Sequence, residues 1–139
     1  MKIVINDCYG GFGLSIKAKE RISELRGEKL YTYNQTKYKF QHGIDEWTRV
    51  DNNCESWFTI SFTKDFGEKV DGDTLDFDYS FNNPERNDLY LIQVVEELGE
   101  ESYGKCSELK IVEIPDDVEW EIKEYDGSEW IAEKHKIWS

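Results

Sequence analysis

The sequence has 139 residues, the length of one ordinary domain, and its 14% of aromatic residues argues against disorder because large side chains offset the entropy lost on ordering. No apolar run approaches the roughly 18 residues that suggest a membrane-spanning helix, and the first residues lack the apolar stretch of a secretory signal. We therefore expect no membrane insertion, and the formal net charge of −13 predicts no direct binding to nucleic acid, because an acidic surface repels phosphate.

The start of the chain predicts a strand, a glycine-rich loop and a helix. The β-branched run Lys2–Ile5 is typical of a strand, and the loop 8–14 follows it. We expect Ser15 to cap a helix over 16–26, because serine is a favoured capping residue, and Gly27 to end that helix.

The middle of the chain predicts strands only. Segments 30–33 and 37–40 are expected to form an aromatic-rich hairpin, and 57–62 a further strand. Residues 75–81 alternate apolar and polar side chains with the period of two that is typical of a strand. We consider 28–83 a candidate β-rich elaboration inserted into a smaller core.

The last part of the chain predicts a helix over 88–98, a strand over 109–114 and a C-terminal hairpin. In the hairpin, 118–125 alternates cleanly, the turn pair Asp126-Gly127 favours a tight reversal, and 128–137 returns.

The order of elements predicts a single α+β domain over residues 1–139, with two helices packed on a mostly antiparallel sheet. On the hairpin, Glu119 and Glu121 would share an exposed face, and Trp120 would lie in the core. Trp130 and Ala132 would alternate on the returning strand, less cleanly.

The acidic excess lies in the second half of the chain. Residues 1–69 carry 11 basic and 10 acidic side chains, whereas residues 70–139 carry 6 and 20. Acidity for solubility and attraction to a basic protein partner are both consistent with this pattern. The candidate partner-binding carboxylates are Asp76, Asp78, Asp116, Asp117, Glu119, Glu121, Glu124, Asp126, Glu129 and Glu133.

The sequence predicts no metal site and no cofactor. Cys8, Cys54 and Cys106 are odd in number and widely spaced, without the C-x-x-C pattern of zinc sites, so reduced thiols are expected. Four aspartates between 71 and 78 suggest a cation loop, but the glycine is misplaced for an EF-hand. A turn entering an acidic strand is therefore the favoured interpretation.

The loop 10–15 is the one candidate ligand site. Backbone N–H groups between a strand and a helix can cradle an anion, although the glycine spacing matches no phosphate-binding fingerprint. Two interpretations of the loop remain, a tight turn and a ligand-binding loop. Two interpretations of the Cys8 thiol remain as well, an inert buried group and a reactive one. The residues of the candidate ligand loop are Cys8, Gly10, Gly11, Gly13, Ser15, Arg86 and His135.

Two blocks of sequence resemble a family of small uncharacterised proteins encoded by bacteriophages and prophages. The first is the opening INDCYGGFGLS, and the second comprises VVEELG, LKIVEIPDDVEW and EYDG, with the ending HKIW. The resemblance covers roughly residues 1–27 and 84–138 and leaves 28–83 unmatched. It implies a phage or prophage origin and a location in the cytoplasm of a bacterial host, and it brings no established activity.

Two functional hypotheses follow. The first is a non-enzymatic phage accessory protein that binds and inhibits a host protein with a basic surface, such as a nuclease of CRISPR or another defence system, by presenting carboxylates where nucleic-acid phosphates would lie. The alternative is a protein that binds or degrades a nucleotide signal with the loop 10–15.

Overall fold

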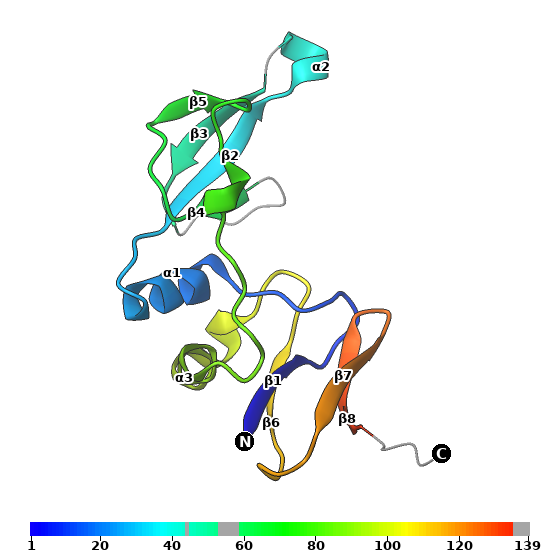
Figure 1. Ribbon diagram of the computed structural model, residues 1–139. Coiled ribbons are helices and arrows are strands. Elements are labelled where there is room, and N and C mark those ends of the chain that lie inside the picture. The colour runs from blue at the N-terminus through cyan, green and yellow to red at the C-terminus, as the bar shows by residue number, and fades with distance from the viewer. Residues whose placement is uncertain (44, 53–58, 135–139) are drawn as a thin grey trace. The chain divides into compact units, whose positions relative to one another are not determined.

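The computed structural model describes residues 1–43, 45–52 and 59–134 (Figure 1). It confirms the α+β class and the C-terminal hairpin. All strand pairs in the described residues are antiparallel, and they form three sheets rather than one. The elements in chain order are β1 (Lys2–Asn6), α1 (Ile16–Leu25), β2 (Tyr31–Lys37), α2 (Lys39–His42), β3 (Glu46–Val50), β4 (Thr59–Phe62), β5 (Lys69–Asp71), η1 (Phe77–Tyr79), α3 (Leu89–Leu98), η2 (Gly99–Ser102), β6 (Leu109–Glu113), β7 (Trp120–Tyr125) and β8 (Ser128–Glu133).

The chain divides into two compact units. The first unit comprises residues 1–18 and 84–139, and the second comprises residues 19–83. The segment 28–83, expected as an elaboration, falls within the second unit. Each unit is described by itself below.

In the first unit, β1 pairs with β6, and β7 pairs with β8. Directly paired residues of an antiparallel ladder share a face, so Ile3 lies beside Val112 and Val4 beside Ile111. The face that carries Lys2 lies toward α3, because Lys2 Nζ lies 2.8 Å from a carboxylate oxygen of Glu96. Ile3 and Val4 are fully buried, so both faces of β1 are covered.

Both predicted helices are confirmed, with the capping that the sequence indicated for the first. The Ser15 hydroxyl accepts a hydrogen bond from the Ala18 N–H at 3.1 Å, and Gly27 follows α1 with φ +78°. At the start of α3, the Asp88 carboxylate accepts from the N–H groups of Tyr90 and Leu91. A side-chain acceptor at this position satisfies donors that have no partner within the helix.

In the second unit, four strands pair in the order β4-β2-β3-β5. One face of this sheet carries a core of buried apolar side chains. The core residues are Tyr33, Trp47, Phe62, Val70 and Leu75. Tyr33 is fully buried and its ring meets the ring of Phe62 edge-on, with 5.8 Å between centroids.

Two predicted strands of this unit are wrong. Residues 37–40 end β2 and begin the one-turn helix α2, so the hairpin partner of β2 is β3, which the sequence did not predict. Residues 75–81 contain the 3-10 turn η1 instead of a strand. The Asp76 carboxylate accepts from the Asp78 N–H at 3.0 Å, and such a local bond competes with strand pairing.

The remaining strand predictions hold where the chain is described. β4 covers the described part of 57–62, while residues 57 and 58 lie outside the described residues, as do 135–137 of the returning hairpin strand. The three-residue strand β5 was not predicted, since its length gives too little alternation to detect.

The phenol of Tyr33 yields a first prediction, because its oxygen accepts from the Phe66 N–H at 2.8 Å and donates to the Gly67 carbonyl at 2.9 Å. We expect Tyr33→Phe to lower the free energy of unfolding by about 1–3 kcal/mol, since it leaves both backbone groups without their hydrogen-bond partner. Urea denaturation measures the loss. Tyr125→Phe is the control, because Tyr125 is 70% exposed, and an equal loss in both variants would contradict the assignment.

Candidate functional site

The acidic residues of the hairpin lie in the more acidic of the two units. The first unit contains 8 basic and 17 acidic residues, a net charge of −9, whereas the second contains 9 and 13, a net charge of −4. Seven predicted partner-binding carboxylates stand in the first unit with exposed or half-buried side chains. They are Asp116, Asp117, Glu119, Glu121, Glu124, Asp126 and Glu133.

Most of these carboxylates are not neutralised by the rest of the described chain. The Asp116 carboxylate lies 2.5 Å from the N-terminal amine, and this hydrogen bond and charge lower the pKa of Asp116. Glu121 lies 3.7 Å from Lys123 on the same strand. Within the described residues, the other five form no ion pair, so their charge is available to a partner.

Glu129 is a correction to the predicted acidic surface. The structure buries it and leaves the neighbouring Trp130 47% exposed, so β8 presents the tryptophan outward and the carboxylate inward. A carboxylate is buried at small cost only when it is paired, and Glu129 is paired with Arg86. Glu129 is therefore a structural residue.

The ion pair of Arg86 and Glu129 is bidentate. Two guanidinium nitrogens of Arg86 donate to the two carboxylate oxygens at 2.5 and 2.9 Å. One of these oxygens also accepts from the Asn6 N–H at 2.8 Å, and the guanidinium stacks 3.6 Å from the centroid of the Phe12 ring. Arg86 was predicted as a residue of the candidate ligand loop, but its charge is already neutralised by Glu129.

Two further predicted carboxylates, Asp76 and Asp78, lie in the second unit. Both are exposed and belong to the turn at η1. Trp120 was expected in the core and is instead half-buried. Its exposed part lines a groove that is described below.

Of the three glycines in the loop 10–15, Gly10 is required by a close backbone contact. A Cβ on Gly10 would stand 2.4 Å from the carbonyl oxygen of Cys106, and a Cβ on Gly127 would stand 2.3 Å from the Gly11 nitrogen. Gly104 packs equally tightly on Gly13, with 2.8 Å between its virtual Cβ and the Gly13 carbonyl carbon. The loop therefore packs against two other segments of the first unit, which accounts for Gly10 without a ligand. Gly11 is favoured by its φ of +93° alone, because nothing lies within 4 Å of its virtual Cβ.

Other polar groups of the predicted ligand loop are also engaged. The Cys8 thiol is half-buried and donates to the Cys106 carbonyl at 3.2 Å, and the Ser15 hydroxyl donates to the Glu101 carbonyl at 2.6 Å. His135 lies outside the described residues.

Asn6 organises this region, and sequence reasoning missed it. The side chain is fully buried; its amide donates to the carbonyls of Cys8 and Gly127 at 2.7 Å, and its oxygen accepts from the Glu108 N–H at 2.9 Å. The available signal was an asparagine directly after an apolar strand, where a buried amide needs several partners.

The aspartates near residue 71 form the turn that the favoured interpretation expected, but the turn leads into η1 and not into an acidic strand. The Asp71 carboxylate accepts from the N–H and the hydroxyl of Thr74 at 2.9 and 2.7 Å, and these bonds lower its pKa. In the part of the chain that the structure describes, no group of three His, Cys, Asp or Glu side chains could hold a metal ion.

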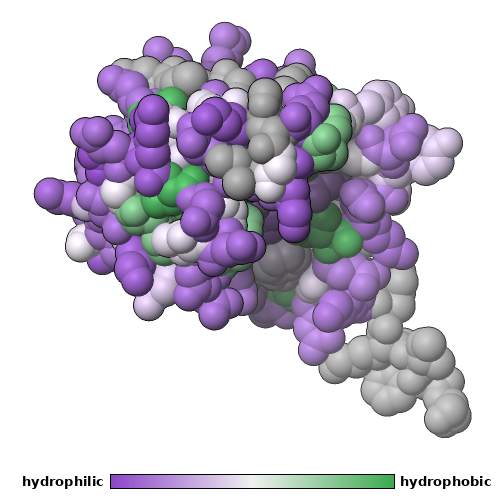
Figure 2. Space-filling view, turned by 90° about the horizontal axis from the view of Figure 1, so that it is seen from above, coloured by the Kyte–Doolittle hydropathy of each residue, from purple (hydrophilic) through white to green (hydrophobic). Residues whose placement is uncertain are grey.

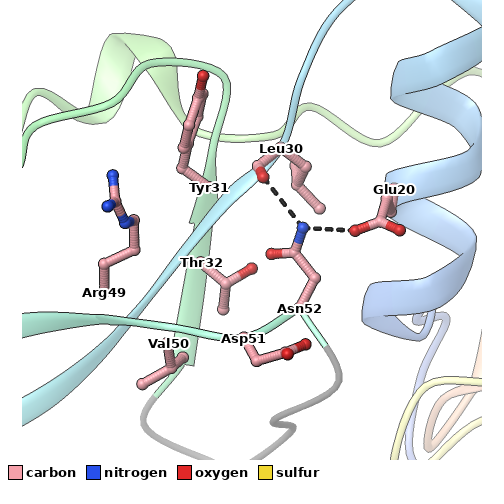
Figure 3. A pocket seen from close by; sticks show the side chains of 8 residues that line it. All are labelled: Glu20, Leu30, Tyr31, Thr32, Arg49, Val50, Asp51 and Asn52. Atoms are coloured by element: carbon pink, nitrogen blue, oxygen red, sulfur yellow. Dashed lines mark hydrogen bonds between the residues drawn. The ribbon is translucent and has the colours of Figure 1, made fainter. Parts of the chain in front are cut away.

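A polar hollow of about 350 Å³ lies in the second unit (Figure 3). Asn52 donates from its amide nitrogen to the Glu20 carboxylate at 2.5 Å and to the Leu30 carbonyl at 3.0 Å. Arg49, on the same wall, pairs with Asp65 at 2.7 Å. These internal bonds occupy the groups that would recognise a ligand, so the hollow is a weaker candidate than the hairpin.

The first unit also contains an apolar groove of about 500 Å³. Strands β1, β6 and β8, the start of β7 and the segment between β6 and β7 form its walls. The lining residues are Ile5, Asp7, Lys110, Val112, Ile114, Pro115, Val118, Trp120, Glu129, Trp130, Ile131 and Glu133.

Hydrophilic residues predominate on the face drawn in Figure 2, and hydrophobic residues occupy small separate areas of it. No helix in residues 1–43, 45–52 and 59–134 is long and apolar enough to cross a membrane. A comparison of the chain with family models, curated proteins and solved structures finds no match in any of the three.

The glycine contacts yield a second prediction. Gly127 and Gly11 both have positive φ, +89° and +93°, but only Gly127 has atoms within 4 Å of a virtual Cβ. We expect Gly11→Ala to cost about 1–3 kcal/mol of unfolding free energy through backbone strain, and Gly127→Ala to cost clearly more through the added clash. Thermal and urea unfolding compare the two, and equal losses would refute the packing role of Gly127.

The buried ion pair yields a third prediction. Arg86→Met should lower the free energy of unfolding by about 3–5 kcal/mol, because it leaves the Glu129 carboxylate buried without its cation. The exposed pair of Lys123 and Glu121 is the control. Lys123→Met should change the free energy of unfolding by less than about 1 kcal/mol. The double variant Arg86→Met with Glu129→Met should lose less than the sum of the single losses, and simple additivity would contradict the coupling.

Proposed function

We propose that this chain is a phage-type accessory protein that binds and inhibits a host protein through the acidic surface of its C-terminal hairpin, in the cytoplasm of a bacterial host. The partner has a basic surface, as a nuclease of a host defence system does. The protein acts by occupying that surface and performs no catalysis.

The observation that carries the proposal is the set of five exposed carboxylates without an ion pair in the described residues: Asp117, Glu119, Glu124, Asp126 and Glu133. Like charges held close together on a small unit repel one another and lower its stability. A basic partner removes that repulsion and is attracted from a distance, which raises the rate of encounter.

The excess of negative charge on the first unit also supports a partner with a basic surface. Its net charge of −9 repels phosphate and favours a cationic surface. A channel that guides nucleic acid by its basic residues attracts a carboxylate-rich protein by the same field. The alternative of a nucleotide site at the loop 10–15 is weaker, since backbone packing accounts for Gly10 and the side chains of Cys8 and Ser15 already donate to backbone carbonyls.

Charge reversal at Glu119, directly before β7, and at Glu121 within it (the β7 reversal) yields a fourth prediction. Glu119→Lys with Glu121→Lys brings the net charge of the first unit from −9 to −5, and it should abolish capture of a basic protein from a lysate of the bacterial host. Both side chains are at least partly exposed, so unfolding free energy should change by less than about 1 kcal/mol.

The control makes the same change of charge on the second unit, with Glu28→Lys and Glu68→Lys, both exposed. Wild-type and control baits should retain the same protein, and salt rising from about 50 to 500 mM should elute it. Retention that neither salt nor the β7 reversal affects would contradict the electrostatic mechanism.

A further inference from the structure

The apolar groove of the first unit is an incompletely covered part of its interior. Ile5 is buried at one end, whereas Val112, Ile114, Trp120 and Ile131 are only half-buried along its walls. Its volume of about 500 Å³ is in the range of sites that enclose a ligand or a large side chain. Burying such apolar surface is favourable, so an occupant with an apolar side chain would be stabilised there.

The charges around the groove select the occupant. Asp7 and Glu133 are exposed at the groove, and Lys110 is its only cation among the described lining residues. Glu129 contributes no free charge because Arg86 neutralises it. An apolar side chain flanked by lysine or arginine therefore fits the groove and its surroundings, whereas an acidic peptide would be repelled.

From this we infer that the groove receives a short segment of the protein partner in which an aromatic or aliphatic residue stands between basic residues. The inference rests on the proposed function and deepens it: the exposed carboxylates attract the partner, and the groove holds an anchor side chain. Trp120 is half-buried at the groove and shares a face of the hairpin with Ile131 and Glu133, so it is the residue best placed to pack against that anchor.

The test uses short capped peptides and the whole chain, labelled for NMR. One peptide has a tryptophan between pairs of lysines, a second has glycine in place of the tryptophan, and a third has glutamates in place of the lysines. We expect the first to bind at least about tenfold more tightly than the other two, with chemical-shift changes at Val112, Ile131 and Trp120.

Two variants locate the binding. Trp120→Ala should weaken the tryptophan peptide about tenfold, whereas Tyr125→Ala, which removes an exposed aromatic of the same hairpin outside the groove, should not. Glu133→Lys should weaken it more than Glu124→Lys, since Glu124 lies outside the groove. Thermal melting of each variant checks that it is folded.

The outcomes separate this inference from the proposed function. Equal, salt-sensitive binding of the tryptophan and glycine peptides would overturn the groove and leave the electrostatic proposal intact. Absence of binding by both basic peptides would overturn the groove and count against the proposed function as well. Two other results would also overturn it. Binding that appears only in a chain ending at Lys134 would assign the groove to residues 135–139, and self-association that Trp120→Ala abolishes would assign it to a second copy.

Discussion

The buried ion pair between Arg86 and Glu129 connects the segments of the first unit. Its carboxylate holds the backbone of Asn6 at the end of β1, and its guanidinium stacks on Phe12 in the glycine-rich loop. The Arg86 carbonyl also accepts from the Val4 N–H at 2.8 Å, so the same residue contacts β1 through its backbone. One charge pair thus connects segments that are far apart in sequence. Removing only one of its two side chains is strongly destabilising, because the other charge is then left without its partner.

The pair also determines which face the hairpin presents. With Glu129 directed inward, Trp130 on the opposite face of β8 is directed outward. Ile131 shares the face of Glu129 and lines the groove together with Trp120. The acidic side chains that remain outside form the candidate binding surface, and the groove lies beside them. A single buried carboxylate therefore sets the composition of both parts of the proposed interface.

The sequence predicted the features that local chemistry decides. Ser15 and Gly27 bound α1, and the turn Asp126-Gly127 sits between β7 and β8, because capping and turn formation depend on a few adjacent residues. The predicted strand over 75–81 is wrong because its alternation of apolar and polar side chains is the same as that of a true strand. The sequence pattern does not reveal that the Asp76 carboxylate caps a turn there. The prediction that Glu129 belongs to the exposed acidic surface is wrong because its partner, Arg86, stands 43 residues earlier in the chain. No local sequence pattern indicates an ion pair of that separation.

The ends of the second unit meet. The side chains of Lys19 and Arg26 both lie over the ring of Phe81, at 5.9 and 5.4 Å from its centroid, and Arg26 also donates to the Asn82 carbonyl. A segment whose entry and exit are neighbours can be gained, lost or exchanged in evolution without stretching the chain that surrounds it. Recombination that replaced residues 19–83 would therefore connect a new module to the flanking segments at two neighbouring points of the chain.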